Sequence, residues 1–305
     1  MSDADSLAGL NKHFGISDEL SFRKGPGGLI FAEIDNVHAR ATLALRGAQI
    51  LGWNPKGQQA VIWLSPEAQF EAEQAIRGGI PICWPWFGNH AGRADFPAHG
   101  YARTAPWEIL ETARLENGDT QLKLKLLNDH ASHELWPHQT PLEVRVSIGE
   151  ALSIEVVTLN LGPVPVTIEQ ALHAYFAVGD VRKVRLLGLG DRSYIDKLDQ
   201  DRFKTQAGDL TFTGEVDRVY LDAGGDCLLE DPVLRRRIRI AKRGSHATVV
   251  WNPWEAKAAQ LGDFPANGHL EMLCIESANT ERDSVTLGLH EEHRLSVRYT
   301  VESLD

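Results

Sequence analysis

Two side chains that could exchange protons with a bound molecule lie about a hundred residues apart. Glu276 ends an apolar, strand-like run, and alternation places its carboxylate on an apolar face, where it needs a partner or a chemical role. His173 lies in a second strand-like run, on a polar face typical of a ligand cleft. That face also carries Thr167, Glu169 and Tyr175. The alternatives are a buried salt bridge for Glu276 and a hydrogen-bonded structural histidine at position 173. Asp217 is a weaker candidate, because the adjacent Arg218 could pair with it at a strand end.

Three arginines, Arg77, Arg93 and Arg103, fall within one short stretch of an acidic chain. A guanidinium group binds phosphate or carboxylate oxygens bidentately, so two that converge would form an anion pocket. Exposed, solvated arginines are the alternative. The same stretch is rich in glycine and proline and carries aromatic rings that could form a rigid rim around a sugar: Trp84, Trp86, Phe87 and Tyr101. Packing of these rings in the core is the alternative to such a rim.

The sequence contains no clear motif for a metal site or for nucleotide binding. His133 and His138 lack carboxylates or cysteines that would complete a metal site. Glycine fingerprints for phosphate, a Gly-x-Ser-x-Gly elbow and kinase signatures are absent. The cysteines, Cys83, Cys227 and Cys274, are odd in number and widely spaced, which fits neither a disulfide framework nor a thiolate zinc site. We therefore expect no metal and a reducing, cytoplasmic location.

The segments that position these residues alternate apolar and polar side chains from about residue 25 onward. Alternation is clearest at 122–126, 142–148 and 238–240. Further β-branched or aromatic runs lie at 41–45, 60–64, 152–161, 164–178, 210–220, 247–251, 270–276 and 295–301. Short helices are expected at 6–13 and 66–75. Because no linker or repeat divides the chain, we predict one all-β domain over residues 1–305, with sheets stacked into an extended sandwich that offers one concave face to a ligand.

Composition excludes several classes of protein. The 305 residues include 31 Lys+Arg and 42 Asp+Glu, a net charge of −11, which argues against a nucleic-acid surface over the whole chain. The longest stretch without charged residues, 78–92, is too short and too rich in glycine and proline to span a bilayer. The first six residues are acidic and polar, unlike a signal peptide. Neither a nucleic acid nor a membrane is expected as a partner.

Six segments, in this order, resemble those of the hexose-6-phosphate mutarotases, the glucose-6-phosphate 1-epimerase branch of the aldose 1-epimerase family. The resemblance covers about two-thirds of the chain. The segments are Arg77-Gly78-Gly79-Ile80-Pro81, His99-Gly100-Tyr101-Ala102-Arg103, Leu172-His173-Ala174-Tyr175-Phe176, Asp217-Arg218-Val219-Tyr220, Trp251-Asn252-Pro253-Trp254 and Cys274-Ile275-Glu276.

This resemblance implies a galactose mutarotase-like β-supersandwich with a few short helices and a cofactor-free site on its concave face. The implied reaction interconverts the anomers of an aldohexose 6-phosphate, with glucose 6-phosphate the expected substrate. Carried over by position, Glu276 matches the catalytic base and His173 the catalytic acid. Substrate-binding positions are matched by Arg77, His99, Arg103 and Asp217. Some relatives carry glutamine where this chain has Ala98, which puts one substrate contact in doubt.

Two other functions stay open. A mutarotase of unphosphorylated aldoses is disfavoured by the arginine pair on an acidic chain. A non-catalytic carbohydrate-binding sandwich would leave the placement of His173 and Glu276 unexplained. We expect a small-molecule hexose phosphate as the partner and a monomeric protein.

Overall fold

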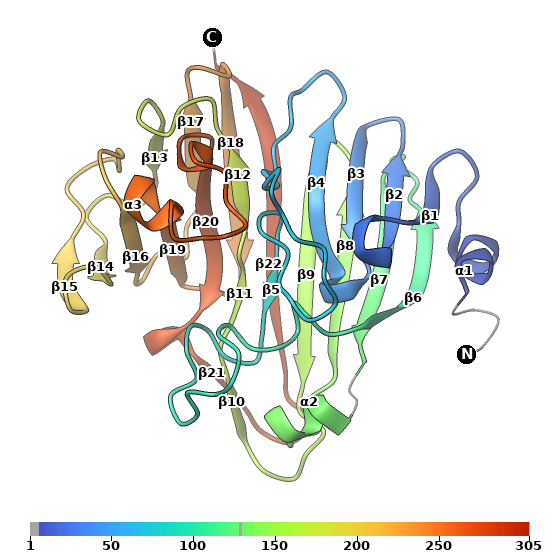
Figure 1. Ribbon diagram of the computed structural model, residues 1–305. Coiled ribbons are helices and arrows are strands. Elements are labelled where there is room, and N and C mark those ends of the chain that lie inside the picture. Colours follow the sequence, from blue (N-terminus) through green and yellow to red (C-terminus); the bar gives the residue numbers. More distant parts are fainter. Residues whose placement is uncertain (1–5, 128–129, 305) are drawn as a thin grey trace.

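The structure, a computed structural model, describes residues 6–127 and 130–304, and β-strands form its framework (Figure 1). Within these ranges the strands form four sheets, in which neighbouring strands run antiparallel. The N-terminal sheet has the order β1-β2-β3-β4, with β1 (Leu20–Lys24), β2 (Ile30–Asp35), β3 (Ala39–Ala44) and β4 (Gln49–Pro55). A small two-stranded sheet pairs β10 (Val166–Ile168) with β21 (Val285–Leu287).

Two eight-stranded sheets make up the rest of the framework. The back sheet has the order β13-β17-β18-β22-β9-β8-β7-β6, with β13 (Arg185–Leu187), β17 (Cys227–Asp231), β18 (Arg236–Arg243), β22 (Glu292–Ser303), β9 (Ala151–Leu159), β8 (Leu142–Ile148), β7 (Thr120–Leu126) and β6 (Trp107–Arg114). The site sheet has the order β15-β14-β16-β19-β20-β11-β5, and β12 also pairs with β20. Its strands are β15 (Arg202–Thr205), β14 (Ser193–Asp196), β16 (Val216–Tyr220), β19 (Ala247–Asn252), β20 (Met272–Asn279), β11 (Gln170–Leu172), β5 (Ile82–Cys83) and β12 (Tyr175–Ala177).

The hydrophobic core lies between these sheets. The back sheet contributes Val297 and Tyr299, the site sheet Leu273 and Ile275, and the N-terminal sheet Leu43 to one buried cluster. Figure 1 shows the N-terminal sheet over β6–β9 and the site sheet beside it, with the back sheet extending behind both. Because side chains alternate along β20, the strand that buries Leu273 and Ile275 presents its other face away from this core.

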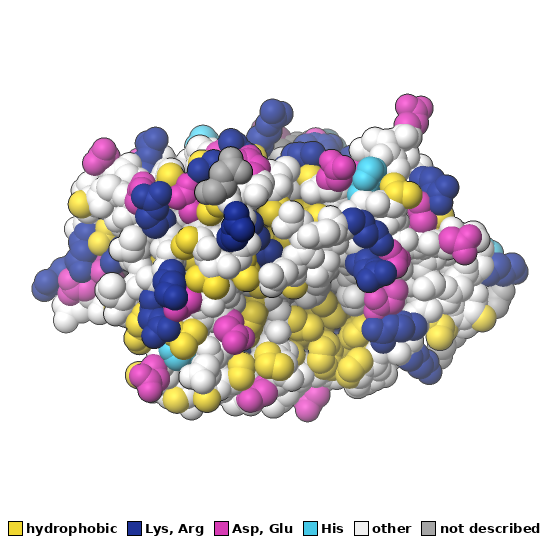
Figure 2. Space-filling model, turned by 90° about the horizontal axis from the view of Figure 1, so that it is seen from above, with side chains coloured by type: hydrophobic (Ala, Val, Ile, Leu, Met, Phe, Trp, Pro, Cys, Tyr) yellow, Lys and Arg dark blue, Asp and Glu magenta, His cyan; other side chains and the backbone are white. Residues whose placement is uncertain are grey.

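Helices are short and peripheral in the described part of the chain. They are α1 (Leu7–Phe14), α2 (His130–Leu135) and α3 (Trp254–Ala258), with 3₁₀ turns η2 (Pro26–Gly28), η3 (Arg46–Ala48), η4 (Gly268–Leu270) and η5 (Glu281–Asp283). None of the described helices is long and apolar enough to cross a membrane. On the face drawn in Figure 2, basic and acidic side chains intermingle, with hydrophobic side chains exposed between them.

The predicted all-β fold is confirmed, with differences in detail. The helix expected at 6–13 forms as α1, and Ser6 caps it by accepting a hydrogen bond from the Gly9 amide at 3.0 Å. The prediction of a helix at 66–75 is wrong. Ala68 and Phe70, two residues apart, pack on the same small hydrophobic cluster, which an extended chain permits and a helix does not.

Some expected strands are also shorter than the sequence suggested. The run 164–178 forms three strands, β10, β11 and β12, because the chain changes partner from β21 to β20. Segment 60–64 makes only single bridges at Ile62 and Leu64. Segment 210–220 is a strand only in its last part, as β16.

Candidate active site

Strand register sets four side chains in a row across the site sheet. The register pairs Asp217 with Trp251, Trp251 with Cys274, and Cys274 with Tyr175. Directly opposed residues of an antiparallel pair share one face of the sheet, so these four side chains lie side by side. They occupy the face opposite to the core. The alternation of β20 adds Glu276 to this face, two residues beyond Cys274.

His173 lies beside Glu276 at the point where β11 ends and β12 has not yet begun. Its backbone amide donates to the Pro81 carbonyl at 3.0 Å, and its ring stacks on Tyr175 with centroids 4.9 Å apart. The His173 Nε2 and Glu276 Oε1 atoms are 3.3 Å apart, and the two side chains are 10% and 1% exposed. The fold therefore brings together two residues that are about a hundred positions apart.

Burial controls the charge of this pair. Removal from water raises the pKa of Glu276 well above its usual value, and the nearby Asp217 raises it further. Burial also lowers the pKa of His173, with His99 and Arg103 adding to the effect. Both shifts favour the neutral form of the pair, a protonated carboxyl beside a neutral imidazole. Its proton count equals that of a carboxylate–imidazolium pair, so moving one proton across 3.3 Å interconverts the two forms.

His99 reaches the site through a tight turn. Its φ is +64°, and a side chain on the following Gly100 would meet the Trp84 carbonyl oxygen at 1.9 Å, so only glycine permits this approach. His99 Nδ1 accepts a hydrogen bond from the Gly88 amide at 3.3 Å. Burial, with Arg103 nearby, lowers the pKa of His99 to about 3. The ring is therefore neutral, with its proton on Nε2 as a hydrogen-bond donor.

The two arginines reach the site in different ways. Arg77 donates from Nε to Asp263 Oδ1 at 3.1 Å and from Nη1 to the Tyr175 hydroxyl at 3.2 Å, which leaves its remaining N–H groups for a ligand. Arg103 donates from Nη2 to the Ala98 carbonyl at 2.7 Å. This bond uses the backbone of residue 98, so it does not depend on the side chain there.

Asp217 points to the site without Arg218. Successive residues of β16 face opposite sides, and Arg218 donates to Gln206 at 3.1 Å and covers the Tyr194 ring at 4.6 Å. The expected alternative of a strand-end salt bridge between the two is therefore wrong. Burial raises the pKa of Asp217 to about 6 despite the opposing charge of Lys197.

These side chains line one cleft of about 850 Å³, which contains all six predicted site residues. Two lysines, Lys197 and Lys257, also line it and were not predicted. Both belong to segments without a distinctive sequence signal. The cleft is lined by Arg77, His99, Arg103, His173, Asp217 and Glu276, together with Phe87, Glu169, Tyr175, Trp251, Thr280 and Glu281 among others.

The structure decides between the alternatives that the sequence left open for two features of the stretch 77–103. Arg93 lies outside the cleft and pairs with Asp95 at 2.6 Å. The proposed aromatic rim is mostly core, because Trp84, Trp86 and Tyr101 are at most 6% exposed within the main hydrophobic cluster. Rings that do line the cleft are Phe87, Tyr175 and Trp251. Sequence alternation had placed Tyr175 on the face of His173, and Trp251 belongs to one of the six resembling segments.

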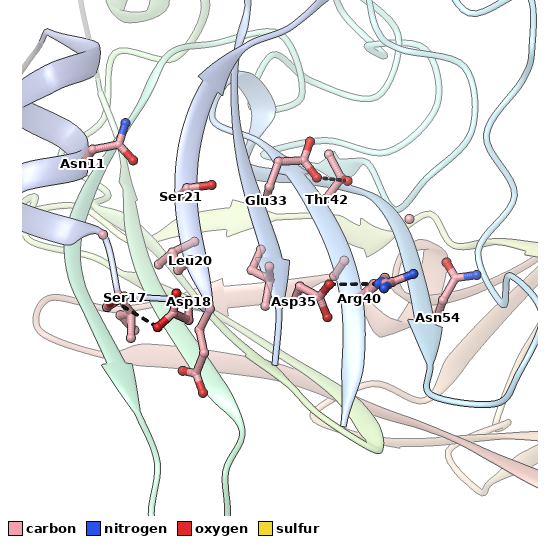
Figure 3. A pocket seen from close by; sticks show the side chains of 16 residues that line it. Asn11, Ser17, Asp18, Leu20, Ser21, Glu33, Asp35, Arg40, Thr42 and Asn54 are labelled. Atoms are coloured by element: carbon pink, nitrogen blue, oxygen red, sulfur yellow. Dashed lines mark hydrogen bonds and ion pairs between the residues drawn. The ribbon is translucent and has the colours of Figure 1, made fainter. Parts of the chain in front are cut away.

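A second hollow, of about 790 Å³, lies over the solvent-facing side of the N-terminal sheet (Figure 3). Its polar groups largely satisfy one another. Asp35 accepts from Arg40 at 2.9 Å, and Glu33 accepts from Thr42 at 2.8 Å. None of the predicted site residues lies there, so the cleft of the site sheet is the candidate active site.

One group of residues, two of which line this cleft, has the chemistry to hold a metal ion. The ligand atoms of His173, Cys274 and Glu276 lie within 4.8 Å of one another, and all three residues are buried. Cys274 was not predicted as a site residue. The three cysteines are free, as expected.

The sequence model of the aldose 1-epimerase family matches residues 32–300, and the chain belongs to this family. It is 37% identical to a provisionally named glucose-6-phosphate 1-epimerase of Salmonella typhimurium, over 80% of this chain and 81% of that protein. A similarly named protein of Cenchrus ciliaris is 34% identical, over 83% and 79% of the two chains.

Solved structures agree with this assignment. A crystal structure provisionally described as a mutarotase from Salmonella typhimurium superposes with a TM-score of 0.88 and 31% identity, covering 95% of this chain and 96% of that one. A galactose mutarotase-like protein from Clostridium acetobutylicum superposes with a TM-score of 0.71 at 12% identity, over 94% and 100% of the chains. The latter supports the fold alone, which is the mutarotase-like β-supersandwich that the sequence predicted.

Proposed function

We propose that this chain interconverts the α and β anomers of an aldohexose 6-phosphate, with glucose 6-phosphate the expected substrate. The observation that carries the proposal is the contact of His173 Nε2 with Glu276 Oε1 at 3.3 Å on the floor of the cleft. The names of the relatives point to the same reaction. An acid and a base that meet at one point can serve the two oxygens bonded to one anomeric carbon.

The proposed reaction transfers one proton at each of these oxygens. Glu276, as the carboxylate, takes the proton from the anomeric hydroxyl. The bond between the anomeric carbon and this hydroxyl oxygen becomes a carbonyl. The bond from the anomeric carbon to the ring oxygen breaks, its electron pair stays on that oxygen, and His173 protonates it. The pair is then neutral, the form that burial favours. Rotation about the first carbon–carbon bond and reclosure by the reverse steps give the other anomer.

Neighbouring residues are proposed to orient the sugar. Neutral His99 offers an Nε2–H donor, and Asp217 offers acceptors for hydroxyl groups. Arg77 and Arg103 are proposed to hold the phosphate, with the exposed Lys257 at the same cleft as a further cation. A phosphate held away from the reacting carbon supplies binding energy that orients the ring.

The arginines also separate this function from its alternatives. A mutarotase for free aldoses does not need cationic side chains at the cleft, because its substrate is uncharged. An enzyme for a phosphate ester needs them to bind the phosphate. A carbohydrate-binding module has no use for a buried acid–base pair, and three of the four rings proposed for its rim lie in the core.

The test compares anomer interconversion of glucose 6-phosphate, glucose and galactose. Rates are followed by polarimetry or by NMR exchange at several enzyme concentrations, because the anomers also interconvert spontaneously. We expect an enzyme-dependent rate with the highest kcat/KM for the phosphate ester. Equal kcat/KM for the free sugars would favour the unphosphorylated alternative, and no enzyme-dependent rate would favour the binding module.

We also retain as proposals a single domain over 1–305, a monomeric state and a cytoplasmic location. The shared cluster between the sheets supports the first, since it draws on residues from Leu10 to Tyr299. Size-exclusion chromatography with light scattering tests the second.

A further inference from the structure

A buried thiol lies beside the acid–base pair, and the proposed reaction does not use it. Cys274 is completely buried on β20, with Trp251 and Tyr175 as its neighbours across the sheet. Its Sγ lies within 4.8 Å of the ligand atoms of His173 and Glu276. Isomerisation by proton transfer requires no sulfur, so the thiol gives this site a chemistry beyond acid–base exchange.

The three side chains form a typical ligand set for a thiophilic divalent cation. Zn²⁺ binds cysteine sulfur, histidine nitrogen and carboxylate oxygen in tetrahedral sites. Nitrogen and oxygen ligands about 2.0–2.1 Å from a tetrahedral ion lie about 3.3–3.4 Å apart. The His173 Nε2 to Glu276 Oε1 distance is 3.3 Å. The two atoms are therefore already spaced as two zinc ligands.

Spare ligand capacity in the pair is a second, independent observation. Glu276 is 1% exposed, and its Oε2 atom has no hydrogen-bond partner among the described residues; His173 Nδ1 is likewise unsatisfied there. A buried polar atom without a partner is costly, and a bound cation would satisfy the carboxylate. His173 and Glu276 also line the cleft, so an ion at this point has an entry path and an open fourth position.

We propose that Cys274, His173 and Glu276 bind a thiophilic divalent cation, with Zn²⁺ as the type case, and that the bound ion inhibits the enzyme. The cation displaces the thiol proton and the proton shared by the pair, which pass to water. With Nε2 and the carboxylate on the metal, neither can exchange a proton with a sugar. Inhibition is therefore competitive with substrate. Only the inhibition rests on the proposed function; binding of the ion does not.

Cobalt gives a test of binding that is independent of activity. Co²⁺ replaces Zn²⁺ in such sites and shows a thiolate charge-transfer band in the near ultraviolet. We expect the wild type to develop this band at about one Co²⁺ per chain and to lose it when Zn²⁺ is added. Cys274→Ala should abolish the band. Cys83→Ala is the matched control, because Cys83 is equally buried on the same sheet but outside the ligand set.

Cys274→Ser provides a second variant if alanine disturbs the fold. Serine keeps the size of the side chain, and a hydroxyl binds Zn²⁺ and Co²⁺ more weakly than a thiolate. Circular dichroism and melting temperature verify that each variant is folded. A band that persists in folded Cys274 variants, or the absence of any band in the wild type, overturns the proposed site.

The kinetic arm measures anomer exchange of glucose 6-phosphate against Zn²⁺ concentration, with each variant normalised to its own metal-free rate. We expect Zn²⁺ to raise the apparent KM, leave kcat unchanged and be reversed by EDTA. Cys274→Ala should raise the half-inhibiting concentration by at least about tenfold, because even outer partners of a metal site change affinity 10–100-fold. Equal inhibition of wild type and Cys274→Ala would overturn the inhibitory site. A cobalt band without catalytic activity would instead contradict the proposed function and leave the metal site standing.

Discussion

Asp217, which we propose binds the sugar, is buried at a cost to stability. Burial raises its pKa to about 6 from an ordinary 3.8, so the folded chain holds the proton more tightly than the unfolded chain does. Stability is then lost as pH rises from about 4 to about 6. By linkage, the ionised carboxylate lowers the free energy of unfolding at pH 7 by about 1–3 kcal/mol.

We therefore expect Asp217→Asn to raise the free energy of unfolding by about 1–3 kcal/mol at pH 7 and by clearly less at pH 4.5, while it weakens sugar binding. Urea denaturation at the two pH values measures the first effect, and KM measures the second. An equal gain at both pH values would show that charge is not the cause.

Arg77 and Arg103 should determine selectivity for phosphate. Replacing either with alanine should weaken kcat/KM for the 6-phosphate by about 1.5–3 kcal/mol, the scale of a charge-assisted hydrogen bond, with little change for any residual activity on free glucose. Arg93→Ala is the matched control, since this arginine pairs with Asp95 outside the cleft. Equal losses on both sugars would mean that the arginines support the fold instead of binding phosphate.

At the scale of elements, glycines place the loop that carries Arg77. Gly79 has φ +71°, and a Cβ there would lie 2.3 Å from the Ile50 carbonyl oxygen. Gly28 has a similar φ of +74° but open space around it. Comparing alanine substitutions at these two glycines separates the energetic cost of the backbone conformation from that of the close approach to Ile50.

Gly79→Ala should lower the free energy of unfolding by more than Gly28→Ala, which is expected to cost about 1 kcal/mol. Because Arg77 lies two residues before Gly79, Gly79→Ala should also raise KM for the phosphate ester. Chemical denaturation and steady-state kinetics test the two effects. Equal destabilisation by both variants would contradict the close approach.

Much of this organisation could be predicted from alternation along the strands. Alternation of side chains correctly placed Glu276 and Cys274 on one face of the site sheet. It also correctly placed His173 and Tyr175 on that face. Alternation describes a face only while a strand continues. It failed at Thr167, which bonds to Thr286 outside the cleft because the strand breaks before His173.

Other features could not be read from the sequence because they depend on which neighbours arrive from far away. Trp84 is core because its Nε1 donates to Thr158 on the back sheet at 3.1 Å, a contact 74 residues away. Asp263 holds Arg77 across 186 residues. The helix α3, which contains Lys257, has only five residues, too few for a helical period to show.

At the scale of the whole molecule, the proposed catalytic pair, His173 and Glu276, depends on the joint packing of the sheets. The main cluster contains side chains from all three larger sheets, so we expect them to unfold together. Thermal transitions followed by far-ultraviolet and near-ultraviolet circular dichroism should coincide. Two separated transitions would contradict the prediction of one domain.

The central claim is that Glu276 and His173 exchange the protons that open and close the sugar ring. Glu276→Gln keeps shape and hydrogen bonding but removes the base, and His173→Asn removes the titratable ring. NMR exchange between the anomers of glucose 6-phosphate, measured above the spontaneous rate, tests both directly. We predict that each change lowers kcat by about 10²–10⁴-fold while substrate binding largely survives. Near-wild-type turnover in either folded variant would contradict the account and assign the chemistry to other residues, with His99 and Asp217 the next to replace.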